Sequence, residues 1–219
     1  MKELKKGVFI VFEGGDGVGK STQIEKAEQY IQNKGFPLFV TYEPYDPEHR
    51  KRIEEEQARK LTPEEELDIF CEDRVNHVRD KIRPHVEKNI IVFSSRYRDS
   101  TVAYQGYARG LAINVVRKRA HESQDGVEPD LVLVYDLPAE EGLRRLQKRK
   151  QKMDRIEKEK VDFHERVRQG FIQEAEWHHT HRSPTSYKII DASLSEEKVW
   201  QKTKKCIDAF FLRELDIEL

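Results

Sequence analysis

Residues 14–21 of the chain read Gly14-Gly15-Asp16-Gly17-Val18-Gly19-Lys20-Ser21, a complete match to the pattern GxxxxGK[ST]. The apolar run Val8–Phe12 precedes this stretch, and the helical pattern Thr22–Asn33 follows it. Glycines allow successive backbone N–H groups to approach phosphate oxygens with no Cβ in the way, and the start of a helix adds its positive end. The alternative is an ordinary glycine-rich turn that contains a lysine by chance, and such a turn would need neither the preceding strand nor the following helix. The sequence therefore predicts a phosphate-binding loop, or P-loop, between a strand and a helix.

A loop of this kind binds the phosphates of ATP together with Mg²⁺. We expect the side chain of Lys20 to reach the β- and γ-phosphates and the hydroxyl of Ser21 to ligate Mg²⁺. The expected ATP-binding residues in and beside the loop are Gly14, Gly15, Asp16, Gly17, Val18, Gly19, Lys20, Ser21 and Thr22. The loop predicts a nucleoside triphosphatase or a kinase, and evidence for the acceptor must come from the rest of the chain.

Apolar runs and helical patterns alternate along the whole chain. The apolar runs are Val8–Phe12, Leu38–Tyr42, Ile90–Phe93, Leu131–Tyr135 and Tyr187–Ile190. The helical patterns are Thr22–Asn33, Pro63–Glu87, Leu111–His121, Pro138–Lys150, Val161–His178 and Glu196–Arg213. The runs themselves do not alternate apolar with polar residues, which suits strands buried on both faces. We therefore expect an α/β P-loop NTPase fold, with a five-stranded parallel sheet flanked by helices on both faces and a single domain over residues 1–219.

Charge and cysteine content exclude several other classes of protein. The 219 residues carry 40 Lys and Arg against 41 Asp and Glu, so no overall positive field indicates binding to a nucleic-acid polymer. The two cysteines have no metal-site spacing, and the N-terminal apolar run is too short for a signal peptide or a membrane span. We expect a cytoplasmic protein without a membrane partner. His178, His179 and His181 have no Cys, Asp or Glu at ligand spacing among them, so we expect an exposed helix end there.

Further motifs make the chain similar to the thymidylate kinase family along nearly its whole length. These motifs are Phe12-Glu13-Gly14-Gly15-Asp16, Thr41-Tyr42-Glu43-Pro44, Phe70-Cys71-Glu72-Asp73-Arg74, Arg96-Tyr97 with Ser100 and Ala103-Tyr104-Gln105-Gly106, and Asp154-Arg155-Ile156-Glu157. The resemblance implies phosphorylation of dTMP to dTDP by Mg-ATP, through in-line transfer without a covalent intermediate. It also implies a homodimer, because the family usually forms dimers.

By this resemblance, several side chains would bind the acceptor nucleotide. Asp16 would hydrogen-bond the deoxyribose 3′-OH, and Arg96 would bind the acceptor phosphate, to which a planar, permanently charged guanidinium is suited. Phe70 and Arg74 are one helical turn apart, so Phe70 can stack on a pyrimidine while Arg74 donates to a base carbonyl. Tyr104 would lie against the sugar. The full set of expected acceptor residues is Asp16, Glu43, Phe70, Arg74, Arg96, Ser100, Tyr104 and Gln105.

Residues 144–160 resemble the family's lid, which we expect to be helical. Positioned cations supply most of the catalysis in phosphoryl transfer, and this P-loop has no arginine between its glycines. In the family, enzymes of this kind supply the catalytic arginine from the lid. We expect Arg149 in that role, with Arg155 as the second candidate and Arg145 stacking on adenine. The expected catalytic residues are Asp16, Lys20, Arg96, Arg149 and Arg155.

Departures from the family pattern leave alternatives open. Tyr42 stands where a basic residue is usual and Tyr45-Asp46 replaces paired glycines, so the acceptor can be another deoxynucleotide or a nucleoside. Ser95 occupies the position of an aspartate that helps to hold the water shell of Mg²⁺. Either another acid substitutes, or the enzyme is slower, or the chain is a non-catalytic nucleotide-binding relative. The acids considered as substitutes are Asp16, Glu43 and Asp99.

Overall fold

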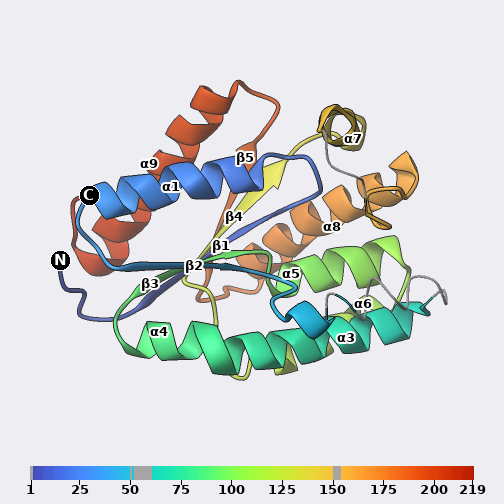
Figure 1. Cartoon of the computed structure of the whole chain (residues 1–219), viewed down its shortest axis with the longest axis horizontal. Helices are drawn as coiled ribbons and strands as arrows, with labels where there is room; N and C mark the ends of the chain where they lie inside the picture. The colour runs from blue at the N-terminus through green and yellow to red at the C-terminus, as the bar shows by residue number, and fades with distance from the viewer. Residues whose placement is uncertain (1, 50, 52–60, 150–153) are drawn as a thin grey trace.

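Parallel strands form the centre of the molecule (Figure 1). The computed structural model describes residues 2–49, 51, 61–149 and 154–219. Its strands are β1 (Val8–Gly14), β2 (Leu38–Tyr42), β3 (Ile91–Ser95), β4 (Leu131–Asp136) and β5 (Ser186–Asp191). They are ordered β2-β3-β1-β4-β5, and every neighbouring pair is parallel. The five-stranded parallel sheet predicted from the sequence is therefore confirmed.

The central strand, β1, is buried on both of its faces. Ile10 and Phe12 belong to the apolar core on one side of the sheet, and Phe9 and Val11 belong to the core on the other side. Each of these four side chains is at most 1% exposed. This double burial explains why apolar residues follow one another along the strand without alternation.

Helices cover both faces of this sheet (Figure 1). On one face, α1 (Lys20–Asn33) packs beside α9 (Glu196–Leu215), and on the other α8 (Val161–Thr180) contributes apolar side chains to the core. The remaining helical elements are α3 (Pro63–His77), the π-helical η2 (Val78–Ile82), α4 (Arg83–Glu87), α5 (Arg98–Thr101), the π-helical η3 (Val102–Ala108), α6 (Ile113–Glu122) and α7 (Ala139–Lys148). Within the described ranges, no helix is long and apolar enough to cross a membrane.

Two helical segments differ from the prediction. Residues 98–108, directly after β3, are helical although the sequence did not predict a helix there, because the buried side chains of α5 are polar and give no apolar stripe. The predicted helical lid over residues 144–160 is helical only in its first part. Helix α7 ends at Lys148 and residues 155–158 form a turn, while residues 150–153 lie outside the described residues.

The expectation of an exposed helix end is wrong for His178, although it holds for His179 and His181. The ring of His178 stacks on that of Tyr187, with centroids 4.7 Å apart and planes 7° apart. Its Nε2 lies 3.3 Å from Nη2 of Arg98. The residue is 8% exposed, so this imidazole is part of the packing between α8 and β5.

His178 belongs to a buried cluster with Asp99 and Glu174, whose ligand atoms lie within 4.8 Å of one another. Arginines already neutralise both carboxylates. Nε of Arg98 lies 3.4 Å from Oδ1 of Asp99, and Nη2 of Arg117 lies 2.7 Å from Oε1 of Glu174. Since each carboxylate is paired with an arginine, the cluster is best described as a buried ion-pair network.

Protonation of His178 is predicted to make the fold acid-sensitive. Burial is the main cause that lowers the pKa of His178 from 6.5 to about 4; Asp99 opposes the shift, and Arg98 and Arg117 contribute to it. Between these two values the unfolded chain binds a proton that the folded chain refuses, so stability falls as the pH decreases from about 6.5 towards 4. The loss between pH 7 and pH 5 from this group is about 2 kcal/mol.

Urea unfolding at pH 7 and pH 5 measures this effect. The variant His178→Asn should lose less stability on acidification than the unchanged protein, by about 2 kcal/mol. The exposed neighbour provides the control, because His179→Asn should leave the pH dependence unaltered. Equal pH dependence in all three proteins would contradict the assignment.

Candidate active site

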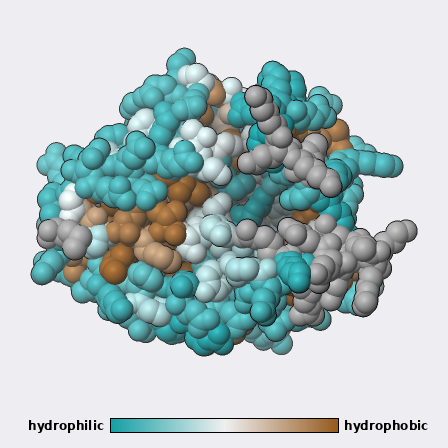
Figure 2. Space-filling model, viewed as in Figure 1, coloured by the Kyte–Doolittle hydropathy of each residue, from teal (hydrophilic) through white to brown (hydrophobic). Residues whose placement is uncertain are grey.

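A pocket of about 400 Å³ lies at the carboxyl ends of β1 and β3. Its charged lining agrees with the hydrophilic hollow that Figure 2 shows on this face of the molecule. Ligands of open parallel sheets bind at this end of the strands. The lining residues are Asp16, Gly17, Val18, Gly19, Lys20, Ser21, Thr22, Ser95, Arg96, Arg145, Leu146, Arg149 and Glu157. The predicted P-loop, the arginine after β3 and two arginines of α7 and its C-terminus therefore meet in one cavity.

The backbone of the P-loop requires glycine at two positions. Gly17 has a φ of 74°, and a Cβ added there would lie 2.2 Å from the carbonyl oxygen of Gly142 at the start of α7. Gly19 has a φ of 94° and precedes the first residue of α1. This left-handed residue allows the helix to begin at Lys20, near which the sequence predicts its start.

Lys20 is held inside the loop rather than extended into solvent. Its Nζ donates to the carbonyl oxygens of Gly14 at 2.8 Å and Gly15 at 2.6 Å. Burial lowers the pKa of Lys20 to about 7, and the nearby Arg96 cation contributes in the same direction. An anion in the pocket would favour the charged form of this side chain.

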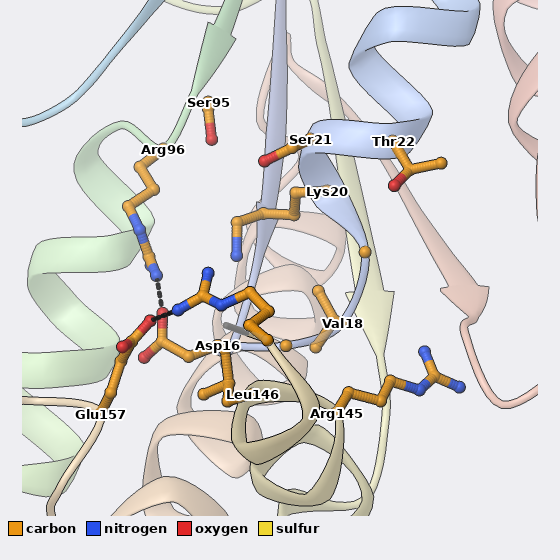
Figure 3. Close-up of a pocket in the computed structure, with 13 residues that line it drawn as sticks. Asp16, Val18, Lys20, Ser21, Thr22, Ser95, Arg96, Arg145, Leu146 and Glu157 are labelled. Atoms are coloured by element: carbon orange, nitrogen blue, oxygen red, sulfur yellow. Dashed lines mark hydrogen bonds and ion pairs between the residues drawn. The ribbon is translucent and has the colours of Figure 1, made fainter. Parts of the chain in front are cut away.

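Three of the predicted acceptor residues form one hydrogen-bonded group, of which Figure 3 shows the pair Arg96 and Asp16. Nη2 of Arg96 donates to Oδ1 of Asp16 and, at 3.0 Å, to the hydroxyl of Tyr104. That hydroxyl donates to Oδ2 of Asp16 at 2.6 Å. Burial alone would raise the pKa of Asp16, but Arg96 and Lys20 together hold it below its ordinary value. The pocket thus contains an ionised aspartate beside a permanent cation.

The lid arginines are separated in space. Nη2 of Arg149 lies 2.5 Å from Oε1 of Glu157, and both side chains line the pocket. Arg155 instead pairs with Glu66 on α3 and is not among the described residues that line the pocket. Glu157 is a pocket carboxylate to which the sequence analysis gave no role, although it ends the Asp154–Glu157 motif.

Arg145 lies at the side of the pocket next to the segment that follows β5. Its Nε donates to Glu141 at 3.0 Å and its Nη2 donates to the carbonyl oxygen of Ala192 at 3.2 Å. In Figure 3 its guanidinium points away from Asp16. The predicted adenine-side position of Arg145 is compatible with this location, because the segment after the last strand borders it.

Glu43 and Arg74 are paired with each other below the surface. Nη2 of Arg74 donates to Oε2 of Glu43 at 2.6 Å, and Nδ1 of His77 lies 3.2 Å from Oε1 of the same carboxylate. Arg74 also donates to Thr101 at 3.0 Å and to Ser123 at 3.4 Å. Contacts with the described residues use four of the five guanidinium N–H groups, and the fifth, on Nη1, has no partner among those residues.

The other predicted acceptor residues are near this group but outside the pocket lining of the described chain. Phe70 is half-buried one turn before Arg74. The hydroxyl of Ser100 donates to Glu13 at 2.7 Å, and Nε2 of Gln105 lies 3.5 Å from Glu66. Ser100 and Gln105 thus contact other residues of the protein, and the acceptor roles of all three residues stay predictions.

Of the acids considered as substitutes for the absent aspartate, Asp16 alone lines the pocket within the described part of the chain. Both oxygens of Glu43 are occupied by Arg74 and His77. Oδ2 of Asp99 accepts a hydrogen bond from Tyr187 at 2.9 Å, on the far side of α5. The expectation that Glu43 or Asp99 substitutes is therefore not supported by their positions.

Substitution of Gly17 by alanine is predicted to destabilise the protein by about 2 kcal/mol or more. The added Cβ would force a left-handed backbone and meet the carbonyl of Gly142. The matched control is Gly15→Ala, because the nearest atom to a Cβ there is Cγ1 of Val18 at 3.9 Å. Urea unfolding of both variants tests this, and equal losses of stability would contradict the steric argument.

Comparisons with known proteins agree with this geometry. The family model described as thymidylate kinase matches residues 12–203. A thymidylate kinase of Carboxydothermus hydrogenoformans is 37% identical over 202 residues, covering 91% of this chain and 96% of that protein. One of Kosmotoga olearia is 38% identical over 201 residues, covering 90% and 94%. The crystal structure of thymidylate kinase from Ehrlichia chaffeensis has a TM-score of 0.70 at 25% identity and covers 92% of this chain and 99% of its own. The chain therefore belongs to the thymidylate kinase family.

Proposed function

We propose that this chain transfers the γ-phosphoryl group of ATP to dTMP and releases ADP and dTDP. The observation that carries the proposal is the position of Arg96 and Asp16 opposite Lys20 in a single pocket. One side of the pocket offers a P-loop for a triphosphate, and the other offers a cation and a carboxylate for a phosphorylated sugar. Family membership supports dTMP as the acceptor.

The donor side of the pocket suits ATP with Mg²⁺. The N–H groups of the P-loop and the start of α1 would bind the β- and γ-phosphates, towards which Lys20 would extend. Magnesium prefers oxygen ligands, and the hydroxyls of Ser21 and Ser95 and the carboxylate of Asp16 line this pocket. Ser21 would hold the ion, which when bound neutralises charge on the donor phosphates.

On the acceptor side, the pairs already present would exchange partners. Arg96 would turn from Asp16 to the phosphate of dTMP, and the freed carboxylate would accept a hydrogen bond from the 3′-OH of the sugar. The hydroxyl of Tyr104 is hydrogen-bonded to both residues, and its ring would lie where a 2′-OH would need space. The remaining N–H of Arg74 would be available to a base carbonyl.

Arg149 would stabilise the charge that spreads over the transferred group. Its guanidinium lies in the pocket and is held by Glu157, so it needs little reorganisation to reach a phosphate. No covalent intermediate is required, because the phosphate of dTMP attacks in line and carries no proton that a base must remove first. Water must be excluded during this step, since it would otherwise accept the phosphoryl group.

ADP release with Mg-ATP against dTMP, dUMP, dCMP, dGMP, UMP and thymidine tests the proposal. We expect dTMP to give the fastest release. Preference for another acceptor would retain the mechanism and assign specificity to the altered segment Tyr42–Asp46 after β2. Binding of ATP without acceptor-dependent release would identify a non-catalytic relative and contradict the proposed function.

Replacement of Arg149 by alanine should lower kcat with dTMP by about 10³-fold or more, because a cation would be lost from the transferred phosphoryl group. The KM for dTMP should change little. The matched control is Lys148→Ala, since that side chain is exposed and is not among the described residues that line the pocket. A similar loss of kcat in both variants would argue against a specific role for Arg149, and steady-state kinetics distinguishes the two outcomes.

A further inference from the structure

Arg96 has a backbone conformation that few non-glycine residues adopt. Its φ is 72°, in the left-handed region, at the junction between β3 and α5. Such a conformation costs free energy and persists only where the surrounding structure holds it. The backbone N–H of Arg96 donates to the carbonyl oxygen of Phe12 at 3.0 Å, which ties the junction to β1. The hydroxyl of Ser94 donates to the carbonyl oxygen of Arg96 at 2.8 Å, and Glu13, the next residue of β1, contacts the residues that follow Arg96.

The carboxylate of Glu13 accepts hydrogen bonds from three donors that follow Arg96 in the chain. Oε1 accepts from the backbone N–H of Tyr97 at 2.8 Å and of Ser100 at 3.2 Å. Oε2 accepts from the hydroxyl of Ser100 at 2.7 Å. Glu13 is 0% exposed, so solvent does not take the place of these donors. One buried carboxylate therefore closes the turn in which Arg96 lies.

A second connection leads from Glu13 to the guanidinium itself. The hydroxyl of Ser100 donates its hydrogen to Glu13, so its oxygen can accept a hydrogen bond from another donor. Nη1 of Arg96 donates to that oxygen at 3.2 Å. Glu13 thus controls Arg96 both through the backbone of the turn and through the side chain of Ser100.

We propose that Glu13 is a positioning residue that orients Arg96 for the phosphate of the acceptor nucleotide. The inference rests on the proposed function, since it takes Arg96 to be the group that binds this phosphate. It also assigns Ser100 an indirect role: Ser100 connects Glu13 to Arg96 and does not itself need to touch the nucleotide. Glu13 lies one residue before the P-loop, so the donor and acceptor sides are joined within one short segment of β1.

The surroundings of Glu13 disfavour its charged form. Burial raises the pKa of this carboxyl to about 7, with Asp99 as a second cause, and the hydrogen bond from Ser100 and the charge of Arg96 only partly oppose the shift. A buried carboxyl with a pKa perturbed in this way is typical of a functional site.

The proposal is tested by the variant Glu13→Gln, which keeps the size of the side chain and one acceptor oxygen. Its NH2 group replaces the oxygen that accepts from the hydroxyl of Ser100, so a donor there faces a donor. We expect binding of dTMP to weaken about 10-fold and binding of ATP to change less than about 2-fold, as measured by calorimetry. Glu174→Gln is the matched control, because Glu174 is a buried carboxylate like Glu13. It pairs with Arg117 instead of Ser100. This control variant should leave dTMP binding unaltered.

Arg96→Lys completes a double-mutant cycle. If Glu13 acts through Arg96, Glu13→Gln should weaken dTMP binding less than about 2-fold once lysine replaces the guanidinium. Equal effects in the two backgrounds, or equal losses of ATP and dTMP binding, would show a general structural role and overturn the proposal. Ser100→Ala keeps the backbone contacts of Glu13 and should cost about 3-fold in dTMP affinity.

These measurements distinguish failure of the proposed function from failure of the role assigned to Glu13. If the unchanged protein binds no dTMP, the proposed function is wrong. If it binds and phosphorylates dTMP and Glu13→Gln does so with the same affinity, the proposed function stands and only the role of Glu13 is wrong. Thermal unfolding of each variant identifies any loss of affinity that comes from unfolding.

Discussion

The burial of β1 between β3 and β4 is the constraint on which the site depends. A strand with apolar neighbours on both faces and hydrogen-bonded partners on both edges cannot shift its register without exposing its core side chains. Its carboxyl end is therefore a fixed point from which the P-loop departs. Glu13, the last side chain before the loop, reaches the adjacent turn after β3, so the same fixed point also locates Arg96.

Each of the three arginines that line the described pocket is paired with a carboxylate. Arg96 is paired with Asp16, Arg149 with Glu157 and Arg145 with Glu141. The side chain of Arg96 is only 20% exposed, and an unpaired cation there would be costly. In the proposed reaction, phosphate groups would replace the carboxylates at Arg96 and Arg149, so these two arginines would exchange partners. The existing pairs would thus hold positive charge in place for phosphoryl transfer.

The sequence predicted the fold well because strand burial and the P-loop are local patterns, whereas much of the site depends on contacts between distant segments. All five strands and the helix Pro63–Glu87 were recognised from apolar runs and spacing. Residues 98–108 were missed, because α5 buries polar side chains that serve the network around Arg96 and Arg98. Arg155 pairs with Glu66 on α3 and is thereby separated from Arg149. This contact joins two segments distant in the sequence, so neither the pattern of α3 nor that of the lid could predict it.

The close approach of Gly17 and Gly142 links the P-loop to α7 by backbone contact alone. A Cβ on Gly142 would lie 2.6 Å from the carbonyl oxygen of Asp16, so neither position tolerates a side chain. The two glycines consequently restrict one another during sequence divergence. A larger residue at one position cannot be compensated by a smaller residue at the other, because glycine is already the smallest residue. Libraries that vary the lid to alter nucleotide preference should therefore leave both positions untouched and begin beyond the first turn of α7.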